Sequence, residues 1–419
     1  MVNRQNFLLL KKEYIIEAVQ HLRQLVFEVT DRCNLKCKYC GYGELYCSYD
    51  ERKSRDISLI KAKGLLDYLA GFWRELYTDI DPHRVSIGFY GGEPLLNVPF
   101  IKEIQNHISE NYSGFVIPEY NMTTNAMLLD RYMDYLVENN FSLLISLDGD
   151  EEGQSYRVDH RGRNSFSTVI RNVFLLRDKY PEYFKKRVSF NAVLHNKNST
   201  QGLYDFFKNN IEKLPMISEL NNSGIREDKR NEFEKIFVSK QTDLYNSFNS
   251  EALIDEMFYD VADTKSLYSY LEGFSNNIYK SYVDLLPDKS QMSYLQTGTC
   301  IPFSKKMFLT TNGKILACER IDQKFALGYI TDEGVDLDFE MIVETYNRRY
   351  LLLRNQCAKC YRSRICSQCF YYIKDIDEKP ICDGYMDKIG FDCFQKAQKQ
   401  FLAEHPYLYK RILDKLTIY

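Results

Sequence analysis

Three cysteines, Cys33, Cys37 and Cys40, stand at C-x3-C-x2-C spacing near the start of the chain. An apolar run at residues 25–30 comes directly before them and is typical of a β-strand. Three thiolates held close together bind three corners of a four-iron cluster and leave the fourth iron with an open position. An open iron suits chemistry on a bound molecule better than simple electron storage. This asymmetry constrains the chain more than any other sequence feature.

The distribution of the twelve cysteines favours metal over disulfides. Four lie in residues 33–47, and the other eight lie in residues 300–393. The first residues carry a short apolar run followed by two lysines, an order that is wrong for a secretory signal, so we expect a cytoplasmic protein with reduced thiols. We expect no membrane span, because uninterrupted apolar stretches of about 18 residues are missing. The net charge of −3 argues against a general electrostatic grip on nucleic acid.

Strand and helix patterns alternate from residue 25 to residue 210. We expect strands at residues 25–30, 85–90, 120–124, 142–148 and 187–194. We expect helices at residues 57–77, which Asp56 would cap, and at 99–111, 130–139, 167–180 and 203–210. This alternation predicts an α/β fold with a parallel sheet, as an open or closed barrel. Chemistry gathers at the carboxyl ends of strands in such folds, and the cysteine loop, Gly91–Pro94, Asn125 and Asp148 all fall there.

The rest of the chain carries fewer signals. Residues 215–297 show helical patterns at 228–248 and 251–271, and we expect a helical insert there, with a lid over a substrate channel as the alternative. Asn312-Gly313 between β-prone runs predicts a hairpin at 307–318. The tail is expected to be helical from 394 to 418. We therefore expect five parts: an N-terminal extension, a barrel, an insert, a cysteine-rich domain and a C-terminal helix, at residues 1–24, 25–214, 215–297, 298–395 and 396–419.

The region around the first cysteines resembles the radical S-adenosylmethionine (SAM) superfamily. The cysteine loop follows a strand, carries the aromatic Tyr39 beside its last cysteine, and precedes a Gly91-Gly92-Glu93-Pro94 turn at the next strand end. The resemblance implies a partial (β/α)6 TIM-like barrel and a [4Fe-4S] cluster at Cys33, Cys37 and Cys40. It also implies SAM at the open iron, cleaved to a 5′-deoxyadenosyl radical that takes hydrogen from an unactivated C–H bond. A zinc site completed by Cys47 is the alternative.

The same resemblance assigns further residues to SAM. The two glycines of the turn let the backbone approach the ligand, and the Glu93 carboxylate receives the SAM ammonium group. The other assigned side chains are Tyr39 at the adenine, Asn125 and Ser146 at the carboxylate or ribose, and Arg157 at the carboxylate. The alternatives are a strand-end hydrogen bond for Asn125 and for Ser146, and an exposed surface position for Arg157.

The eight later cysteines resemble the SPASM extension, which carries two auxiliary [4Fe-4S] clusters. By spacing alone, C-x2-C pairs serve zinc equally well. The resemblance implies that Cys300, Cys318 and Cys369 bind the first auxiliary cluster. It implies that the second is bound by Cys357, Cys360, Cys366 and either Cys382 or Cys393.

Two features depart from the SPASM pattern. The spacer between Cys366 and Cys369 is x2 where the family usually has x3, and two late cysteines stand where one is needed. Cys393 precedes the expected C-terminal helix, much as the final family ligand does. Cys382 would then complete the first auxiliary cluster, or the two roles are reversed. If neither cysteine reaches that cluster, one of its irons stays open.

SPASM proteins mostly modify peptides or proteins. Sulfatase-maturating members carry an aspartate, proposed as a base, where this chain has Glu319 after Cys318; a surface pair of Glu319 with Arg320 is the alternative. The Cys-Glu-Arg form looks more like enzymes that crosslink ribosomal peptides. Three hypotheses follow: a peptide maturase that forms a thioether or carbon–carbon crosslink, an anaerobic sulfatase-maturating enzyme that forms formylglycine, and a non-catalytic iron or zinc scaffold.

The maturase hypothesis implies partners. They are a ribosomal precursor peptide or protein and an electron donor such as flavodoxin or ferredoxin. Only 24 residues precede the first expected strand. We therefore expect leader recognition to use the barrel, the middle insert or a separate leader-binding protein.

Overall fold

The computed structural model describes residues 7–78, 82–274 and 295–414, and it divides into two compact units. The barrel unit comprises residues 15–250 and 302–338. The cysteine-rich unit comprises residues 1–14, 251–301 and 339–419. This division differs from the expected one, because the barrel unit includes both the start of the expected insert and the predicted hairpin. Across the described ranges, every helix is too short or too polar to cross a membrane.

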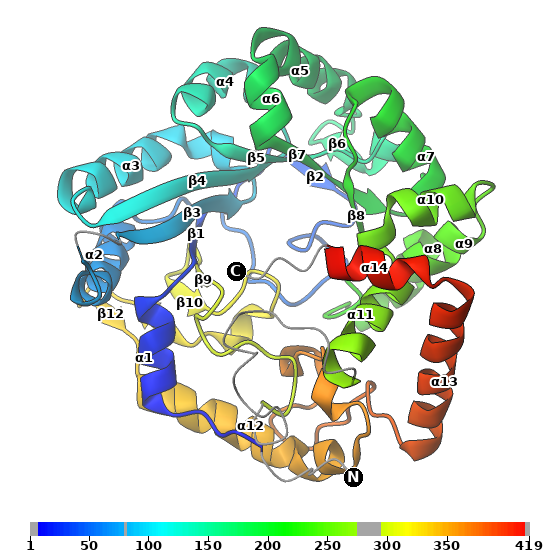
Figure 1. Cartoon of the computed structure of the whole chain (residues 1–419). Helices are drawn as coiled ribbons and strands as arrows, with labels where there is room; N and C mark the ends of the chain where they lie inside the picture. Colours follow the sequence, from blue (N-terminus) through cyan, green and yellow to red (C-terminus); the bar gives the residue numbers. More distant parts are fainter. Residues whose placement is uncertain (1–6, 79–81, 275–294, 415–419) are drawn as a thin grey trace. The chain divides into compact units, whose positions relative to one another are not determined.

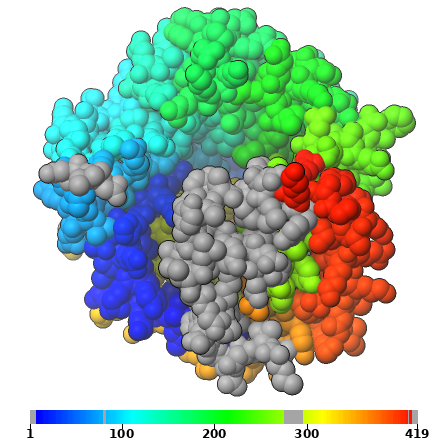
Figure 2. Space-filling model, viewed as in Figure 1, coloured from blue at the N-terminus to red at the C-terminus, as the bar shows by residue number. Residues whose placement is uncertain are grey.

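Six parallel strands form the barrel. In sheet order they are β1 (Gln24–Thr30), β3 (His83–Gly91), β4 (Val116–Thr124), β5 (Ser142–Ser146), β7 (Val188–Leu194) and β8 (Met216–Glu219). Helices cover the outside of this curved sheet (Figure 1), and in the space-filling view this part of the chain is coloured from blue through cyan to green (Figure 2). These helices are α2 (Leu59–Glu75), α3 (Val98–Tyr112), α4 (Leu129–Glu138), α5 (Phe166–Lys179), α6 (Pro181–Arg187) and α7 (Thr200–Phe206). The (β/α)6 arrangement agrees with the predicted α/β fold.

The strand β1 shows why the sheet is covered on both faces. Its residues 25–30 are all buried, the polar Glu28 and Thr30 included, with no alternation between buried and exposed positions. Such a run is typical of a parallel strand between two layers. The Phe27 ring stacks on Phe89 of β3 at 6.3 Å between centroids and meets Phe100 of α3 edge-on at 5.9 Å. Strand β1 and the cysteine loop that follows it are thereby fixed to the core.

The sixth strand lies in the range where we expected a helical insert. Strand β8 has four residues and buries only Ile217, so its pattern is too short to recognise in the sequence. Two helices, α8 (Arg230–Ile236) and α9 (Lys240–Tyr245), replace the single helix expected at 228–248. Phe237 is extended, which ends α8, and the Ser239 hydroxyl caps α9 by accepting from the Thr242 amide at 3.5 Å.

The predicted hairpin is confirmed and extends the sheet. Strands β9 (Met307–Leu309) and β10 (Lys314–Leu316) pair antiparallel, and Gly313 in the turn has a φ of +79°. Strand β9 also pairs in parallel with β1, and β11 (Gly328–Ile330) and β12 (Val335–Asp336) follow β10. The ten-stranded sheet therefore places Cys318 and Glu319, just after β10, in the barrel unit.

The expected cap of α2 is wrong by two residues. The Ser58 side chain caps this helix by accepting from the Lys61 amide at 3.4 Å. The Asp56 carboxylate instead pairs with Arg32 in the cysteine loop, with an Nη2–Oδ1 distance of 2.6 Å. Asp56 therefore ties the loop to the segment before α2.

The cysteine-rich unit is largely helical in its described part. Its helices include α11 (Ala262–Phe274), α12 (Phe339–Lys359), α13 (Lys388–Glu404) and α14 (Tyr407–Asp414). The C-terminal helix is thus two helices, and it begins six residues earlier than expected because Asp387 caps α13 by accepting from the Gly390 amide at 2.8 Å. Cys393 therefore lies inside α13 rather than before a helix. Residues 275–294 of the expected insert and 415–418 of the expected tail helix lie outside the described residues.

Candidate functional site

The cysteine loop borders a cavity of about 240 Å³ at the carboxyl ends of the strands. Cys33, Cys37 and Cys40 all line it. Strand β2 (Leu35–Cys37) pairs antiparallel with β6 (Arg157–Asp159), which places Cys37 opposite Arg157. A turn then brings the Cys40 amide to the Cys37 carbonyl at 3.2 Å. The three predicted ligands therefore surround one space.

The thiols of this loop sit in a low-polarity setting with nearby cations. Burial raises the pKa of Cys33 to about 11 and that of Cys37 to about 12, although Arg157 opposes the shift at Cys37. Arg52 Nη2 lies 3.5 Å from Cys40 Sγ. Cations near thiols help them to lose the protons that metal binding requires. Cys47, the alternative zinc ligand, is exposed, and its Sγ lies 3.4 Å from the Gly224 carbonyl oxygen.

No three His, Cys, Asp or Glu side chains gather closely enough to hold a single metal ion in the described residues. In a four-iron cluster each thiolate binds a different iron, so the ligands stand around a space rather than at one point. The three thiols around the cavity fit that arrangement.

The Gly91–Pro94 turn packs against the cysteine loop. Gly91 has a φ of +127°, and a Cβ on Gly92 would lie 1.9 Å from the Arg32 carbonyl oxygen. Only glycine tolerates both conditions. The Gly92 amide donates to the Thr30 carbonyl at 2.8 Å. The glycines are therefore needed for contact between the turn and the loop, a reason beyond the expected approach to a ligand.

Glu93 places a buried carboxylate beside the cavity. Its Oε1 accepts from the Thr124 hydroxyl at 2.6 Å, and its Oε2 accepts from the Asn125 amide at 2.7 Å. Burial raises the pKa of Glu93 to about 7, and these hydrogen bonds limit the shift. The group thus changes charge near neutral pH.

Asn125 and Ser146 line the same cavity at the ends of β4 and β5. The Asn125 side-chain amide donates to Asn34 Oδ1 at 2.7 Å and lies 3.6 Å from Cys33 Sγ. Asn125 therefore joins the end of β4 to the cysteine loop. A role of either residue at SAM stays a prediction.

Arg157 also lines the cavity, but its charge is directed at a carboxylate. It is buried rather than exposed, and its Nε and Nη2 donate to Asp148 at 2.8 and 3.0 Å. The sequence gives no sign of this pair, because Asp148 and Arg157 lie nine positions apart across a loop. The expected pairing of Arg157 with the SAM carboxylate therefore has a competitor within the protein.

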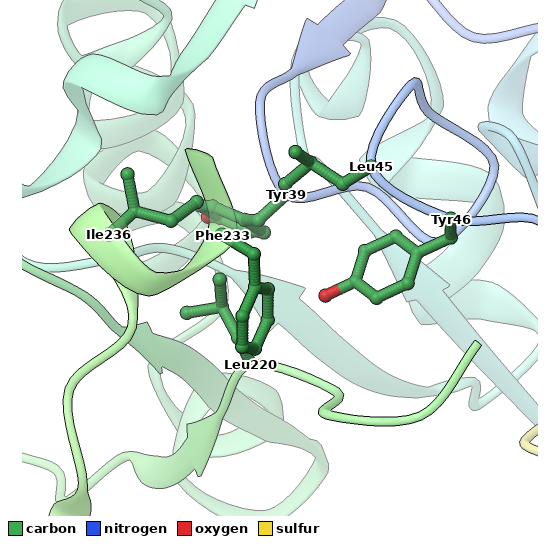
Figure 3. Packing of buried hydrophobic residues seen from close by; sticks show 6 residues of the cluster. All are labelled: Tyr39, Leu45, Tyr46, Leu220, Phe233 and Ile236. Carbon is green, nitrogen blue, oxygen red and sulfur yellow. The ribbon is translucent and has the colours of Figure 1, made fainter. Parts of the chain in front are cut away.

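Tyr39 joins the cysteine loop to the segment that follows β7. A cluster of buried side chains, which we call the loop cluster, holds the two together (Figure 3). Its members are Tyr39, Leu45, Tyr46, Leu220, Phe233 and Ile236. Asn221, next to Leu220, lines the cavity. Residues 216–236 therefore support the site, although the sequence shows no chemistry motif there.

Glu319 lies in a charged pair within the barrel unit. Both carboxylate oxygens accept from Lys306 Nζ, at 3.0 and 2.9 Å, whereas the exposed Arg320 lies 3.9 Å away. Burial is the largest single influence and by itself would raise the pKa of Glu319. The charge and hydrogen bonds of Lys306, with smaller contributions from a backbone amide and Arg320, together lower the pKa below its ordinary value. The Tyr49 hydroxyl donates to the Glu319 carbonyl oxygen at 3.2 Å, and Tyr49 lines the cavity. Glu319 is thereby linked to the cavity wall.

The cysteine-rich unit brings four thiols to one pocket, those of Cys357, Cys360, Cys366 and Cys382. Burial raises the pKa of Cys357 to about 12, and the other three thiols act in the same direction. Cys382 thus joins the C-x2-C-x5-C group, whereas Cys393 is exposed on α13.

Two of the three thiols expected at the first auxiliary cluster interact with each other. The thiol of Cys369 interacts electrostatically with that of Cys300, and the Phe370 amide donates to the Thr299 hydroxyl at 2.8 Å. These contacts lie within the cysteine-rich unit. Cys318 belongs to the barrel unit, and its place in the same ligand set stays a prediction.

Several residues at the site were missed by the sequence reasoning. They are Arg52, Tyr42, Tyr49, Tyr90 and Asn221 on the cavity wall, and His195, which lies 3.8 Å from Asp148. The chain has 33 tyrosines, so residue type alone could not single out these three on the cavity wall. Asp148 was noticed at a strand end, but its partners come from distant segments.

Comparisons with known proteins agree with this geometry. A family model described as the radical SAM superfamily matches residues 27–208. The chain is 22% identical over 415 residues to a radical SAM cyclopropyl synthase from Paramaledivibacter caminithermalis, covering 96% of this chain and 78% of that protein. It is 24% identical over 407 residues to a cysteine-type anaerobic sulfatase-maturating enzyme from Clostridium novyi, covering 94% and 99%.

A solved structure has the same fold. It is native anSMEcpe with bound AdoMet, which is SAM, and a Kp18Cys peptide, with a TM-score of 0.61, 19% identity, and coverage of 94% of this chain and 99% of that one. The fold, the family match and the three thiols around one cavity agree. Residues 27–208 are therefore a radical SAM domain.

Proposed function

We propose that this protein is a radical SAM peptide maturase that forms an oxidative crosslink, a thioether or a carbon–carbon bond, in a ribosomal precursor peptide. One observation carries the proposal: Glu319 presents a carboxylate that is only 16% exposed and is held by Lys306. The backbone carbonyl of Glu319 accepts a hydrogen bond from Tyr49, whose side chain lines the cavity that the cysteine loop borders. A proton acceptor next to a radical site is what removal of two hydrogens from a substrate requires. The similarity to a cyclopropyl synthase, whose product contains a small carbon ring, supports carbon–carbon bond formation.

The family implies SAM and a [4Fe-4S] cluster, and the residues present fit both. Three thiols around one cavity form the donor set for the cluster, and we assign it to Cys33, Cys37 and Cys40. When bound, the pair supplies a 5′-deoxyadenosyl radical that abstracts hydrogen. We assign the SAM ammonium group to Glu93, which can offer a carboxylate on the cavity wall. Tyr39, Asn125, Ser146 and Arg157 complete the proposed wall.

Glu319 is the proposed base. Lys306 keeps the carboxylate ionised at neutral pH and fixes it with two hydrogen bonds. To form its new bond, the substrate would lose one hydrogen atom to the radical and a second hydrogen as a proton and an electron. The Glu319 carboxylate would accept that proton, and one of the two proposed auxiliary clusters would accept the electron.

Two auxiliary [4Fe-4S] clusters are proposed in addition. Four thiols at one pocket form a full donor set for the second auxiliary cluster, so we assign it to Cys357, Cys360, Cys366 and Cys382. Cys300, Cys318 and Cys369 are assigned to the first, which would leave one of its irons open. A ligand role for Cys393 is disfavoured by its exposure on α13.

The proposed partners follow from this chemistry. They are a precursor peptide or protein as substrate and a flavodoxin or ferredoxin as the source of electrons. A separate leader-binding protein is a further proposed partner.

Anaerobic co-expression with candidate precursor peptides tests the proposal. We expect a peptide about two hydrogens lighter than its precursor by mass spectrometry, with the new bond located by fragmentation. The Glu319→Gln variant is expected to cleave SAM but to leave the peptide unmodified. An unmodified peptide with every candidate precursor, while 5′-deoxyadenosine forms, would count against the assigned substrate. Absence of 5′-deoxyadenosine with SAM and a strong reductant would favour the scaffold hypothesis instead.

A second function, formylglycine formation on a sulfatase, is favoured by a specific observation. The chain spans 99% of the length of the Clostridium novyi sulfatase-maturating enzyme. A peptide with a Cys or Ser at the sulfatase position distinguishes the two functions. Formylglycine, trapped as a hydrazone, would support the second function, and an unchanged sulfatase peptide beside a crosslinked precursor would support the first.

A further inference from the structure

Asp148 is a fully buried carboxylate at the end of β5 that receives hydrogen bonds from three separate segments. Arg157 Nε donates to Oδ2 at 2.8 Å, and Arg157 Nη2 donates to Oδ1 at 3.0 Å. The Val193 amide donates to Oδ1 at 2.8 Å, and the Tyr39 hydroxyl donates to Oδ2. His195 Nε2 lies 3.8 Å from Oδ2. This concentration of donors on one carboxylate lies directly behind the cysteine loop.

Two of these partners, Tyr39 and Arg157, are directly next to the last two cysteines of the loop, Cys40 and Cys37. Tyr39 directly precedes Cys40 in the chain. Arg157 stands opposite Cys37 in the β2–β6 pair, and its guanidinium lies 5.4 Å from the centre of the Tyr39 ring. Asp148 thus fixes the two residues that position Cys37 and Cys40.

The charges of the pair are opposite and face the thiols. The Arg157 charge interacts favourably with the ionised thiols of Cys37 and Cys40, and the Asp148 charge opposes ionisation at Cys37. Arg52 Nη2 lies 3.5 Å from Cys40 Sγ, and the Glu93 carboxylate opposes ionisation of the third thiol, Cys33. Because Asp148 and Arg157 are both buried, solvent screens their fields only weakly.

We infer that Asp148 and Arg157 are a positioning pair that sets the reduction potential of the cluster in the cysteine loop and holds Tyr39 and Cys37 in register. The inference rests on the proposed assignment of that cluster to Cys33, Cys37 and Cys40. It concerns residues that do not ligate the cluster. The pair acts through buried charge and through the loop contacts that it fixes.

The direction in which each substitution should change the reduction potential follows from electrostatics. Reduction adds one negative charge to the cluster. Asp148 disfavours that charge and Arg157 favours it. Asp148→Asn therefore raises the potential, Arg157→Gln lowers it, and the double variant, which loses both charges, returns toward the wild-type value.

Redox titrations of the anaerobic holoprotein, monitored by electron paramagnetic resonance, test the inference. The iron–sulfur cluster of the cysteine loop is identified as the signal that changes when SAM is added and that is missing when Cys33, Cys37 and Cys40 are all replaced by Ala. We expect each single variant to shift the reduction equilibrium by about tenfold, which is ~59 mV for a one-electron couple. Tyr39→Phe is the neutral control, because it removes a hydrogen bond to the same carboxylate without changing charge. Arg52→Gln is the positive control and is expected to lower the potential.

Shifts of opposite sign in the single variants, with compensation in the double variant, support the inference. The inference would be overturned if the single variants had the wild-type potential or shifted it in the same direction. It would also be overturned if the potential of the double variant did not return toward the wild-type value. A purely structural role would lower cluster content in both single variants without such compensation. If Asp148→Asn loses its cluster, Arg157→Gln and the double variant decide the question. A wild-type protein without a SAM-sensitive signal would instead refute the proposed cluster assignment.

Discussion

The Glu93 carboxylate is fully buried and that of Glu319 is only 16% exposed, but their surroundings shift their pKa values in opposite directions. Burial dominates at Glu93, whose partners are neutral donors. At Glu319 burial also acts to raise the pKa, but the charge and hydrogen bonds of Lys306 together with smaller contributions lower it overall. A carboxylate with a raised pKa is neutral below that value and ionised above it. Glu93 should therefore change its ionisation near neutral pH, whereas Glu319 should stay ionised there.

Binding of SAM is predicted to strengthen as the pH rises through about 7, where Glu93 ionises. Only the ionised carboxylate makes a charge-assisted hydrogen bond to the SAM ammonium group. Between pH 6 and pH 8 the ionised fraction rises by roughly tenfold, and we expect the affinity to follow it. Equilibrium binding at both pH values checks this. Glu93→Gln should bind weakly and lose that part of the pH dependence, and an equal dependence in both proteins would contradict the role of Glu93.

Loss of the proposed base should slow product formation without stopping SAM cleavage. Glu319→Gln keeps the shape of the side chain but accepts no proton, so we expect turnover to fall by roughly 10²–10⁴-fold. Arg320→Gln is the matched control, because the Arg320 side chain is 80% exposed and 3.9 Å from Glu319. Lys306→Met should raise the pKa of Glu319 and move the acidic limb of the pH–rate profile to higher pH. A full rate in Glu319→Gln would remove this residue from the mechanism.

At the scale of elements, the loop cluster joins the cysteine loop to helix α8 and the residue after β8. The loop is not held by its own hydrogen bonds alone. Apolar burial from a segment about 180 residues further along the chain supports it. The short strand β8 and helix α8 thereby belong to the barrel rather than to an insert.

Phe233→Ala should destabilise the barrel unit by about 3 kcal/mol, because it leaves a cavity beneath Tyr39 and Tyr46. Denaturant unfolding of the anaerobic holoprotein measures this, and iron content at the loop should fall with it. Phe248 lies in the same segment and is 98% exposed, so Phe248→Ala should stay within about 0.5 kcal/mol of wild type. Equal losses from the two variants would show that the loop cluster does not support the barrel.

At the scale of the whole molecule, the chain carries metal-suited thiols in two units. The barrel unit holds Cys33, Cys37, Cys40 and Cys318, and the cysteine-rich unit holds Cys300, Cys357, Cys360, Cys366, Cys369, Cys382 and Cys393. The proposed three clusters correspond to about twelve irons for each chain. About four irons with zinc in place of the rest would overturn the proposal for the later cysteines.

Iron analysis of two serine variants separates the late cysteines. Cys382→Ser is expected to lose about four irons, because Cys382 lines the pocket with Cys357, Cys360 and Cys366. Cys393→Ser should keep the wild-type iron content, since that thiol is exposed on α13. Loss of iron in Cys393→Ser, with none in Cys382→Ser, would reverse the assignment.

Periodicity and spacing were enough to predict most of the barrel. Five of its strands, one helix after each of them and the hairpin around Asn312-Gly313 were predicted, because long apolar runs and an Asn-Gly turn act locally. The short helix α6 was not predicted. Strand β8 was missed because four residues with one buried side chain carry almost no pattern. The start of α13 was missed because its cap, Asp387, is a local signal that the cysteine spacing overshadowed.

The sequence by itself determined that three thiols, a glycine turn and several polar side chains would lie at the carboxyl ends of neighbouring parallel strands. Parallel strands place those ends at one edge, whatever the packing elsewhere. Only the tertiary structure decided which charges meet: Arg157 with Asp148, Lys306 with Glu319, and Cys382 with the C-x2-C-x5-C thiols. These pairings depend on how segments pack in three dimensions, and a linear pattern contains no record of that packing.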